Sequence, residues 1–160
     1  MKTKKANMIV DSLIIIIILL VFAFLLPFLY RFMTDYNTST QASNLSPQAK
    51  TTFDTMTTQF PQWTDNAVLA AFILLWIGAL VASFLIDSHP SFFVMTIILW
   101  IFLLLGMAWI SNAYQDVMAS SNISTYNAFF PRTAFIMSHL VEFMIALGLT
   151  IGVALYAKSR

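Results

Sequence analysis

The chain has 160 residues, of which 59% are hydrophobic and only 9% are charged, whereas soluble domains carry roughly 25% charged residues. A soluble fold of this size could not bury so much apolar surface, so lipid must surround most of the chain. The net charge of +1 gives no global field that would attract nucleic acid, and the absence of cysteine excludes disulfides, thiolate catalysis and cysteine-ligated metal centres.

Four segments are long and apolar enough to cross a bilayer, which takes about 20 mostly apolar residues. They cover residues 8–30, 67–86, 91–110 and 134–156. In lipid each segment must satisfy its backbone hydrogen bonds internally, and it therefore forms a helix. The sequence thus predicts an all-α integral membrane protein, a single domain with four transmembrane helices in an antiparallel bundle.

The first segment follows three lysines, as a secretory signal would. Its apolar core is longer than that of a usual signal, and residues 27–32 offer no small-residue cleavage site, so we expect it to be retained as an anchor. Pro27 falls in its last turn, where only a mild kink is expected.

Basic residues predict the orientation, because short cytoplasmic segments carry an excess of Lys and Arg. The two short tails hold five of them: Lys2, Lys4, Lys5, Lys158 and Arg160. The two longer loops hold three: Arg31, Lys50 and Arg132. We therefore expect both termini in the cytoplasm. The tails could also meet anionic lipid, a shell protein or a genome, or they could only set the topology.

Residues 31–66 form the first predicted outer loop, which is rich in Thr, Ser, Asn and Gln. Ser46 followed by Pro47 is typical of a helix start. Apolar residues then recur at spacings of three and four, which predicts a short amphipathic helix over residues 47–59 that Pro61 ends. This helix could lie flat on the membrane, cover the protein's own spans or pack on a partner.

The second and third spans are joined by four residues, Asp87, Ser88, His89 and Pro90. A residue before proline avoids the helical region, and proline can open the next helix, so we interpret these residues as a tight turn. The alternative is a metal or proton site at Asp87 and His89. Metal binding normally needs three or more ligands, which favours the turn.

Residues 111–133 form the second predicted outer loop. Tyr114, Val117 and Met118 could extend the third helix beyond the lipid. An aromatic patch then precedes Pro131, and its residues suit the headgroup zone of a membrane: Tyr126, Phe129 and Phe130.

The fourth span contains an ionisable pair, His139 and Glu142, three residues apart and therefore on one helix face. Glu142 would sit about nine residues inside the span, roughly 12 Å deep at 1.5 Å per residue. A carboxylate at that depth is a candidate functional group. The pair could form a proton path, or Glu142 could contact another subunit. It could also bond to His139 or to a neighbouring helix, where candidate partners are Ser83, Thr96, Trp76 and Trp100.

Small residues four apart allow close contact between membrane helices. Gly78 and Ala82 form such a pair on the second span, and Gly148 and Gly152 form another on the fourth. These faces are candidate packing surfaces, either within the bundle or between copies of the chain.

No pattern in the sequence indicates an enzyme. Glu142 is the only glutamate, no lysine lies in a span, and no phosphate-binding loop, nucleophile elbow or HExxH motif is present. We therefore expect no catalytic residue, metal site or cofactor.

Residues 87–115 read DSHPSFFVMTIILWIFLLLGMAWISNAYQ. A short polar turn ending in His-Pro, then Phe-Phe, a span and Ser-Asn-Ala-Tyr resembles small integral membrane proteins of tailless icosahedral bacteriophages, whose lipid membrane lies beneath a protein shell. The resemblance implies a structural virion protein that organises the membrane and links it to the capsid, with lipid, capsid proteins and copies of itself as partners. The alternatives are an accessory subunit of a respiratory or photosynthetic complex and a small proton or ion channel using His139 and Glu142.

Overall fold

The computed structural model describes residues 3–85, 90–120 and 122–158, with side chains between residues 15 and 156 except at 82, 84–96, 99, 121, 154 and 155. The described residues form helices and no strand, which confirms the all-α prediction. The helices are α1 (Thr3–Ala42), α2 (Pro47–Leu85), α3 (Pro90–Met118), α4 (Ser124–Asn127), α5 (Pro131–Ser138) and α6 (Leu140–Lys158).

Two helical segments of the described chain are long and apolar enough to cross a membrane, Ile15–Ala42 and Pro47–Val81. A third candidate is the pair Pro131–Ser138 and Leu140–Val153, whose axes bend by 67° at the break between them. These lengths and compositions indicate a membrane protein.

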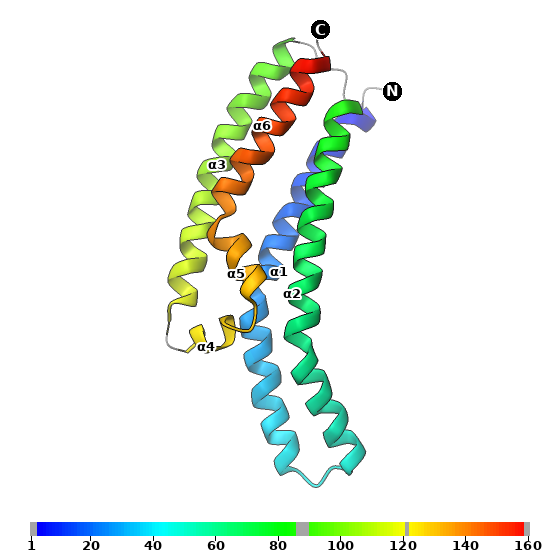
Figure 1. The fold of residues 1–160 in the computed structure, drawn as a ribbon, viewed down its shortest axis with the longest axis vertical. Coiled ribbons are helices and arrows are strands. Elements are labelled where there is room, and N and C mark those ends of the chain that lie inside the picture. The colour runs from blue at the N-terminus through cyan, green and yellow to red at the C-terminus, as the bar shows by residue number, and fades with distance from the viewer. Residues whose placement is uncertain (1–2, 86–89, 121, 159–160) are drawn as a thin grey trace.

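The helices form an elongated molecule (Figure 1). α1 and α2 make a long hairpin, α3 lies beside α6, and the short helices α4 and α5 connect α3 to α6 across the hairpin. The N-terminal end of α1 and the C-terminal end of α6 lie at the same end of the molecule, and the connection between α1 and α2 lies at the other.

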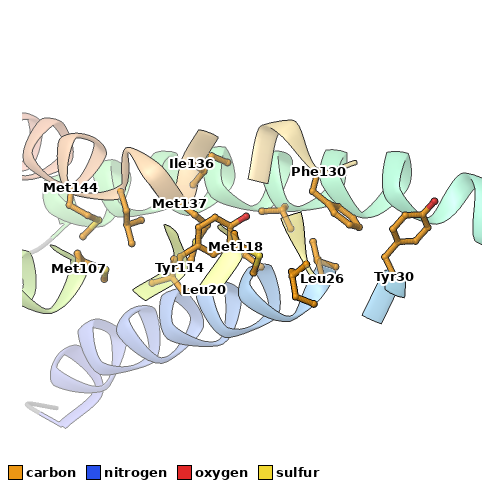
Figure 2. Packing of buried hydrophobic residues seen from close by; sticks show 14 of the residues in the cluster. Leu20, Leu26, Tyr30, Met107, Tyr114, Met118, Phe130, Ile136, Met137 and Met144 are labelled. Atoms are coloured by element: carbon orange, nitrogen blue, oxygen red, sulfur yellow. The ribbon is translucent and has the colours of Figure 1, made fainter. Parts of the chain in front are cut away.

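The buried core lies where α1, α3, α5 and α6 meet (Figure 2). Leu26 of α1 is fully buried, and the Phe24 ring meets the buried Tyr114 of α3 edge-on, with centroids 5.9 Å apart. Met137 and Met144 contribute flexible side chains that can fill irregular gaps between helices. The midsection of the bundle therefore has a true packed interior.

The first predicted outer loop is largely helical, which corrects the expectation for residues 31–66. α1 continues to Ala42, and α2 begins at Pro47 and runs without a break into the second apolar span. Residues 31–42 of α1 and 47–61 of α2 thus form a two-helix arm that extends beyond the ends of α3 and α4 (Figure 1). At 1.5 Å per residue, residues 31–42 alone add about 18 Å to α1.

The prediction that Pro61 ends a short amphipathic helix is wrong, although that helix does begin at Pro47 after a Ser46 cap, with Ala49 N donating to Ser46 Oγ at 3.3 Å. Proline removes one helical hydrogen bond, but Pro61 is buried and the neighbouring Phe60 ring stacks on Tyr30 of α1 with centroids 6.4 Å apart. Packing against α1 therefore keeps the helix continuous.

Contacts between its two helices hold the arm together. The Tyr36 and Phe53 rings meet edge-on at 5.5 Å, and Asn37 Nδ2 donates to Asp54 Oδ1 at 3.3 Å. Near the tip, Lys50 Nζ donates to the Gln41 carbonyl at 2.7 Å, and Gln41 Nε2 donates to the Lys50 carbonyl at 3.0 Å. The lysine thus satisfies a free carbonyl at the end of α1.

The aromatic patch before Pro131 packs around Tyr30 of α1. The Tyr30 ring lies 5.0 Å from Phe129, 5.8 Å from Phe130 and 6.1 Å from Tyr126, measured between centroids. Phe130 is fully buried. This cluster attaches the α4 segment to the base of the arm. α3 does extend beyond the apolar segment, to Met118, as predicted.

Candidate functional site

A buried carboxylate, Asp65 of α2, organises the junction between the hairpin and α5. Its Oδ1 accepts hydrogen bonds from Thr133 N at 2.7 Å and from Thr133 Oγ1 at 2.8 Å, and its Oδ2 accepts from Arg132 N at 3.1 Å. Asp65 is only 2% exposed and Thr133 is fully buried. A side chain from another helix therefore caps the first turn of α5.

This cap has a clear local cause. α5 begins with Pro131 after Phe130, which carries no side-chain oxygen that could accept a hydrogen bond. The free N–H groups of a helix start need an acceptor, and the positive end of the helix dipole favours an anion there. Asp65 supplies both, and in return its burial is compensated by three hydrogen bonds, without which a buried carboxylate would be strongly destabilising.

The Arg132 guanidinium lies at the outer edge of this junction. Its Nη1 is 3.9 Å from Asp65 Oδ2 and also donates to Asn66 Oδ1. The Arg132 side chain is 50% exposed, whereas that of Asp65 is 3% exposed. The ion pair is thus half exposed to solvent, and it places a positive charge at the surface beside α2 and α5.

The C-terminal end of α5 is held by α3. The Ser138 carbonyl lies 3.4 Å from Ser111 Oγ and 3.5 Å from Gln115 Nε2, both of which can donate to it. Ser138 Oγ itself donates to the Ala134 carbonyl. Polar side chains of α3 thus replace helical hydrogen bonds at the point where the chain breaks and turns by 67° into α6.

The fourth predicted span is therefore not one straight helix, and this changes the position of Glu142. His139 ends α5, with its Nδ1 3.0 Å from the Phe135 carbonyl and its ring 4.5 Å from the Phe135 ring. Glu142 lies in the first turn of α6 rather than deep within a continuous span, and it is exposed. The helix dipole favours a carboxylate at that place.

The structure does not join the predicted pair. Among the described residues, Glu142 has no hydrogen bond or ion pair with His139 or with any of the partners expected for it. Ser83 Oγ instead donates to the Leu80 carbonyl at 2.6 Å, and the indole nitrogen of Trp76 is buried without an acceptor. The side chain of Thr96 lies outside the described residues.

The predicted packing glycines differ in their surroundings. At Gly148 an added Cβ would overlap the indole of Trp100 on α3, so a side chain packs directly on the α6 backbone there. Among the described residues outside the glycine's own helical turn, no atom lies within 4 Å of such a Cβ at Gly78 or Gly152. The side chain of Ala82 lies outside the described residues. Of these three glycines, Gly148 is therefore the one at which the described residues show close packing between helices.

Several predicted features lie outside the part of the chain that the structure describes. They include the turn residues Asp87, Ser88 and His89, the side chain of Pro90, and the basic side chains of the tails, which belong to Lys2, Lys4, Lys5, Lys158 and Arg160. Among the described residues, no group of three or more potential metal ligands is present.

An open groove of about 810 Å³ runs along the outer face of the α2 half of the arm. It is lined by Thr and Gln side chains together with Met33, Met56, Phe60 and Trp63. Met56 and Trp63 are 57% and 69% exposed. No charged residue lines the groove.

Asp65 and Arg132 were not singled out by the sequence, because neither is part of a motif. The sequence gives only an indirect indication of the junction. Pro131 begins a helix without an Asp, Asn, Ser or Thr residue before it, so the free N–H groups of its first turn need an acceptor from elsewhere in the chain.

No protein-family model matches this chain, and no curated protein or solved structure is significantly similar to it.

Proposed function

We propose that this chain is a non-catalytic structural protein that crosses a lipid bilayer four times as an antiparallel bundle and connects that bilayer to a protein layer outside it. In this arrangement α3 and the bent pair α5 and α6 supply the third and fourth crossings, and both termini lie in the cytoplasm. The assembly we propose is a virion with an internal membrane, in line with the resemblance of residues 87–115.

The observation that carries the proposal is the arm. Helical residues 31–42 and 47–61 extend past the rest of the bundle (Figure 1), so they would project from the membrane and could reach a second layer. A polar loop of similar length could not hold a second layer at a fixed place relative to the membrane, because the loop would have no fixed direction.

The surface of the arm is suited to a protein partner. Its four charged residues, Arg31, Asp35, Lys50 and Asp54, sum to zero net charge, and a net charge near zero favours association. Many of its hydroxyl groups donate to the carbonyl four residues earlier, so fewer remain for water: those of Thr34, Thr38, Ser39, Thr40, Thr51, Thr52, Thr57 and Thr58. The exposed Met56 and Trp63 are residue types enriched at interfaces.

Cross-linking of the native assembly tests the proposal. Lys50 is the only lysine between residues 6 and 157, so a lysine-reactive reagent reports on the arm separately from the tails. We expect Lys50 to cross-link to an abundant shell protein in purified particles that contain many copies of this chain, and K50R to abolish that product.

Two outcomes contradict the proposal. Recovery at one copy per complex with the subunits of a membrane enzyme would identify an accessory subunit instead. Cross-links to the shell only through the tail lysines would show that the arm does not make the connection.

A further inference from the structure

A second groove, of about 330 Å³, lies between α2 and the bent pair α5 and α6. Its walls are almost entirely apolar and include Leu69, Phe72 and Ile73 of α2 with Phe135 and Phe143. Ile73 and Phe135 are 45% and 55% exposed, so the groove opens to the surroundings of the bundle. Its size lies within the usual range of small-molecule sites.

One charged residue lines this groove, Arg132. Its two protein contacts, to Asp65 and Asn66, both use Nη1, which leaves Nε and Nη2 without an acceptor among the described residues. The Asp65 carboxylate is buried and satisfied by the backbone of α5, and it does not line the groove. Arg132 therefore brings two donors without an acceptor among the described residues to the lining of an apolar groove.

From this juxtaposition we propose that the groove binds one glycerophospholipid of the surrounding bilayer, with the phosphate on Arg132 and an acyl chain between α2 and the α5–α6 bend. Planar guanidinium groups bind phosphate through paired hydrogen bonds. The polar junction at Asp65 and Arg132 adjoins the first apolar turns of α2, where a lipid phosphate would lie. The inference rests on the membrane placement proposed above but not on the protein layer.

The bound lipid would also explain why a groove is present beside the bend between α5 and α6. α5 is held at its start by Asp65 of α2 and at its end by Ser111 and Gln115 of α3, and the groove remains between α2, α5 and α6. The space that remains is apolar, and lipid tails can fill it without a polar penalty.

Native mass spectrometry of the detergent-purified, delipidated full chain tests the proposal. The probes are phosphatidylglycerol, a diacylglycerol with the same acyl chains, and free glycerol 3-phosphate. We expect one phosphatidylglycerol to bind more tightly than any further lipid, the diacylglycerol to bind about tenfold more weakly or not at all, and glycerol 3-phosphate not to displace the lipid.

Two variants and their matched controls locate the site. R132Q removes the phosphate contact but leaves the backbone N–H for Asp65, so we expect about tenfold weaker binding. I73W fills the groove, and we expect it to prevent binding of the tight lipid. R31Q and I77W change a half-exposed arginine and a half-exposed isoleucine that do not line the groove, and they should bind as the parent does.

Equal affinity for diacylglycerol and phosphatidylglycerol, or unchanged binding in both R132Q and I73W, would overturn the lipid site. Displacement by glycerol 3-phosphate would show a free-phosphate site instead and would overturn it too. None of these results would alter cross-linking of the arm, so failure here is distinguishable from failure of the proposed function.

Discussion

At the residue scale, Asp65 has the largest predicted effect on stability. D65A leaves the N–H groups of Arg132 and Thr133 without an acceptor in a buried site, so we expect it to lower the free energy of unfolding by about 3 kcal/mol. D65N keeps one acceptor oxygen and should cost about half as much. Unfolding in mixed micelles by SDS titration measures both.

The matched control for Asp65 is Asp54 on the same helix. Asp54 is exposed and accepts one hydrogen bond, from Asn37. D54A should change the free energy of unfolding by no more than about 0.5 kcal/mol. If D65A and D54A had equal effects, the cap of α5 would have no special role.

Gly148 provides a second test at this scale. G148A places a Cβ where the Trp100 indole packs, and such overpacking typically destabilises by about 1–3 kcal/mol. At Gly152 an added Cβ meets no atom of the described residues outside its own helical turn, so we expect G152A to change the free energy of unfolding by no more than about 0.5 kcal/mol. In SDS titration, a W100F background should reduce the penalty of G148A, since the smaller ring leaves room. An unchanged penalty would contradict the contact.

At the element scale, the arm distinguishes the structure from the sequence-based expectation. We expect single spin labels at successive positions from 50 to 66 to show accessibility with a period of 3.6 residues that continues through Pro61. At Met56, which belongs to the apolar face and is 57% exposed, the label should be more accessible to a water-soluble relaxation reagent than to oxygen.

A helix lying flat on the membrane would give the opposite ranking of the two reagents on its apolar face. A change of phase at Pro61 would show two separate helices. Either result would contradict a continuous arm that projects from the bilayer.

The sequence was sufficient to predict the apolar helices because about 20 apolar residues in lipid have no other stable conformation. It was insufficient for the arm, because Thr and Asn have low helix propensity and tertiary packing of Tyr30 on Phe60 decides the outcome. The break at His139 lacks a nearby proline or glycine and depends on Ser111 and Gln115 of another helix.

The same limit applies to the candidate sites. The Asp65–Thr133 contact joins residues 68 positions apart, and no local sequence pattern can identify so distant a partner. Glu142 was singled out because an ionisable residue inside a long apolar run is unusual, but the bend places it in the first turn of α6. Among the described residues, Asp65 is the carboxylate that is buried and hydrogen-bonded.

At the scale of the whole molecule, the arm lies at the end opposite the described chain ends, and α5 lies between the two ends (Figure 1). This polarity is what a protein that connects two layers requires. This interpretation requires that the bilayer surround the part of the bundle between those two ends. The α1–α2 hairpin contains two candidate membrane spans, so in the arrangement we propose the arm and the tails lie on opposite sides of the bilayer.

The most direct test of this account is cysteine labelling in sealed right-side-out vesicles, which the absence of native cysteine makes unambiguous. N44C at the arm tip and S124C on α4 should react with a membrane-impermeant maleimide in intact vesicles. K5C and K158C should react only after the vesicles are permeabilised. Reaction of the arm tip and the tails from the same side of intact vesicles would contradict the account.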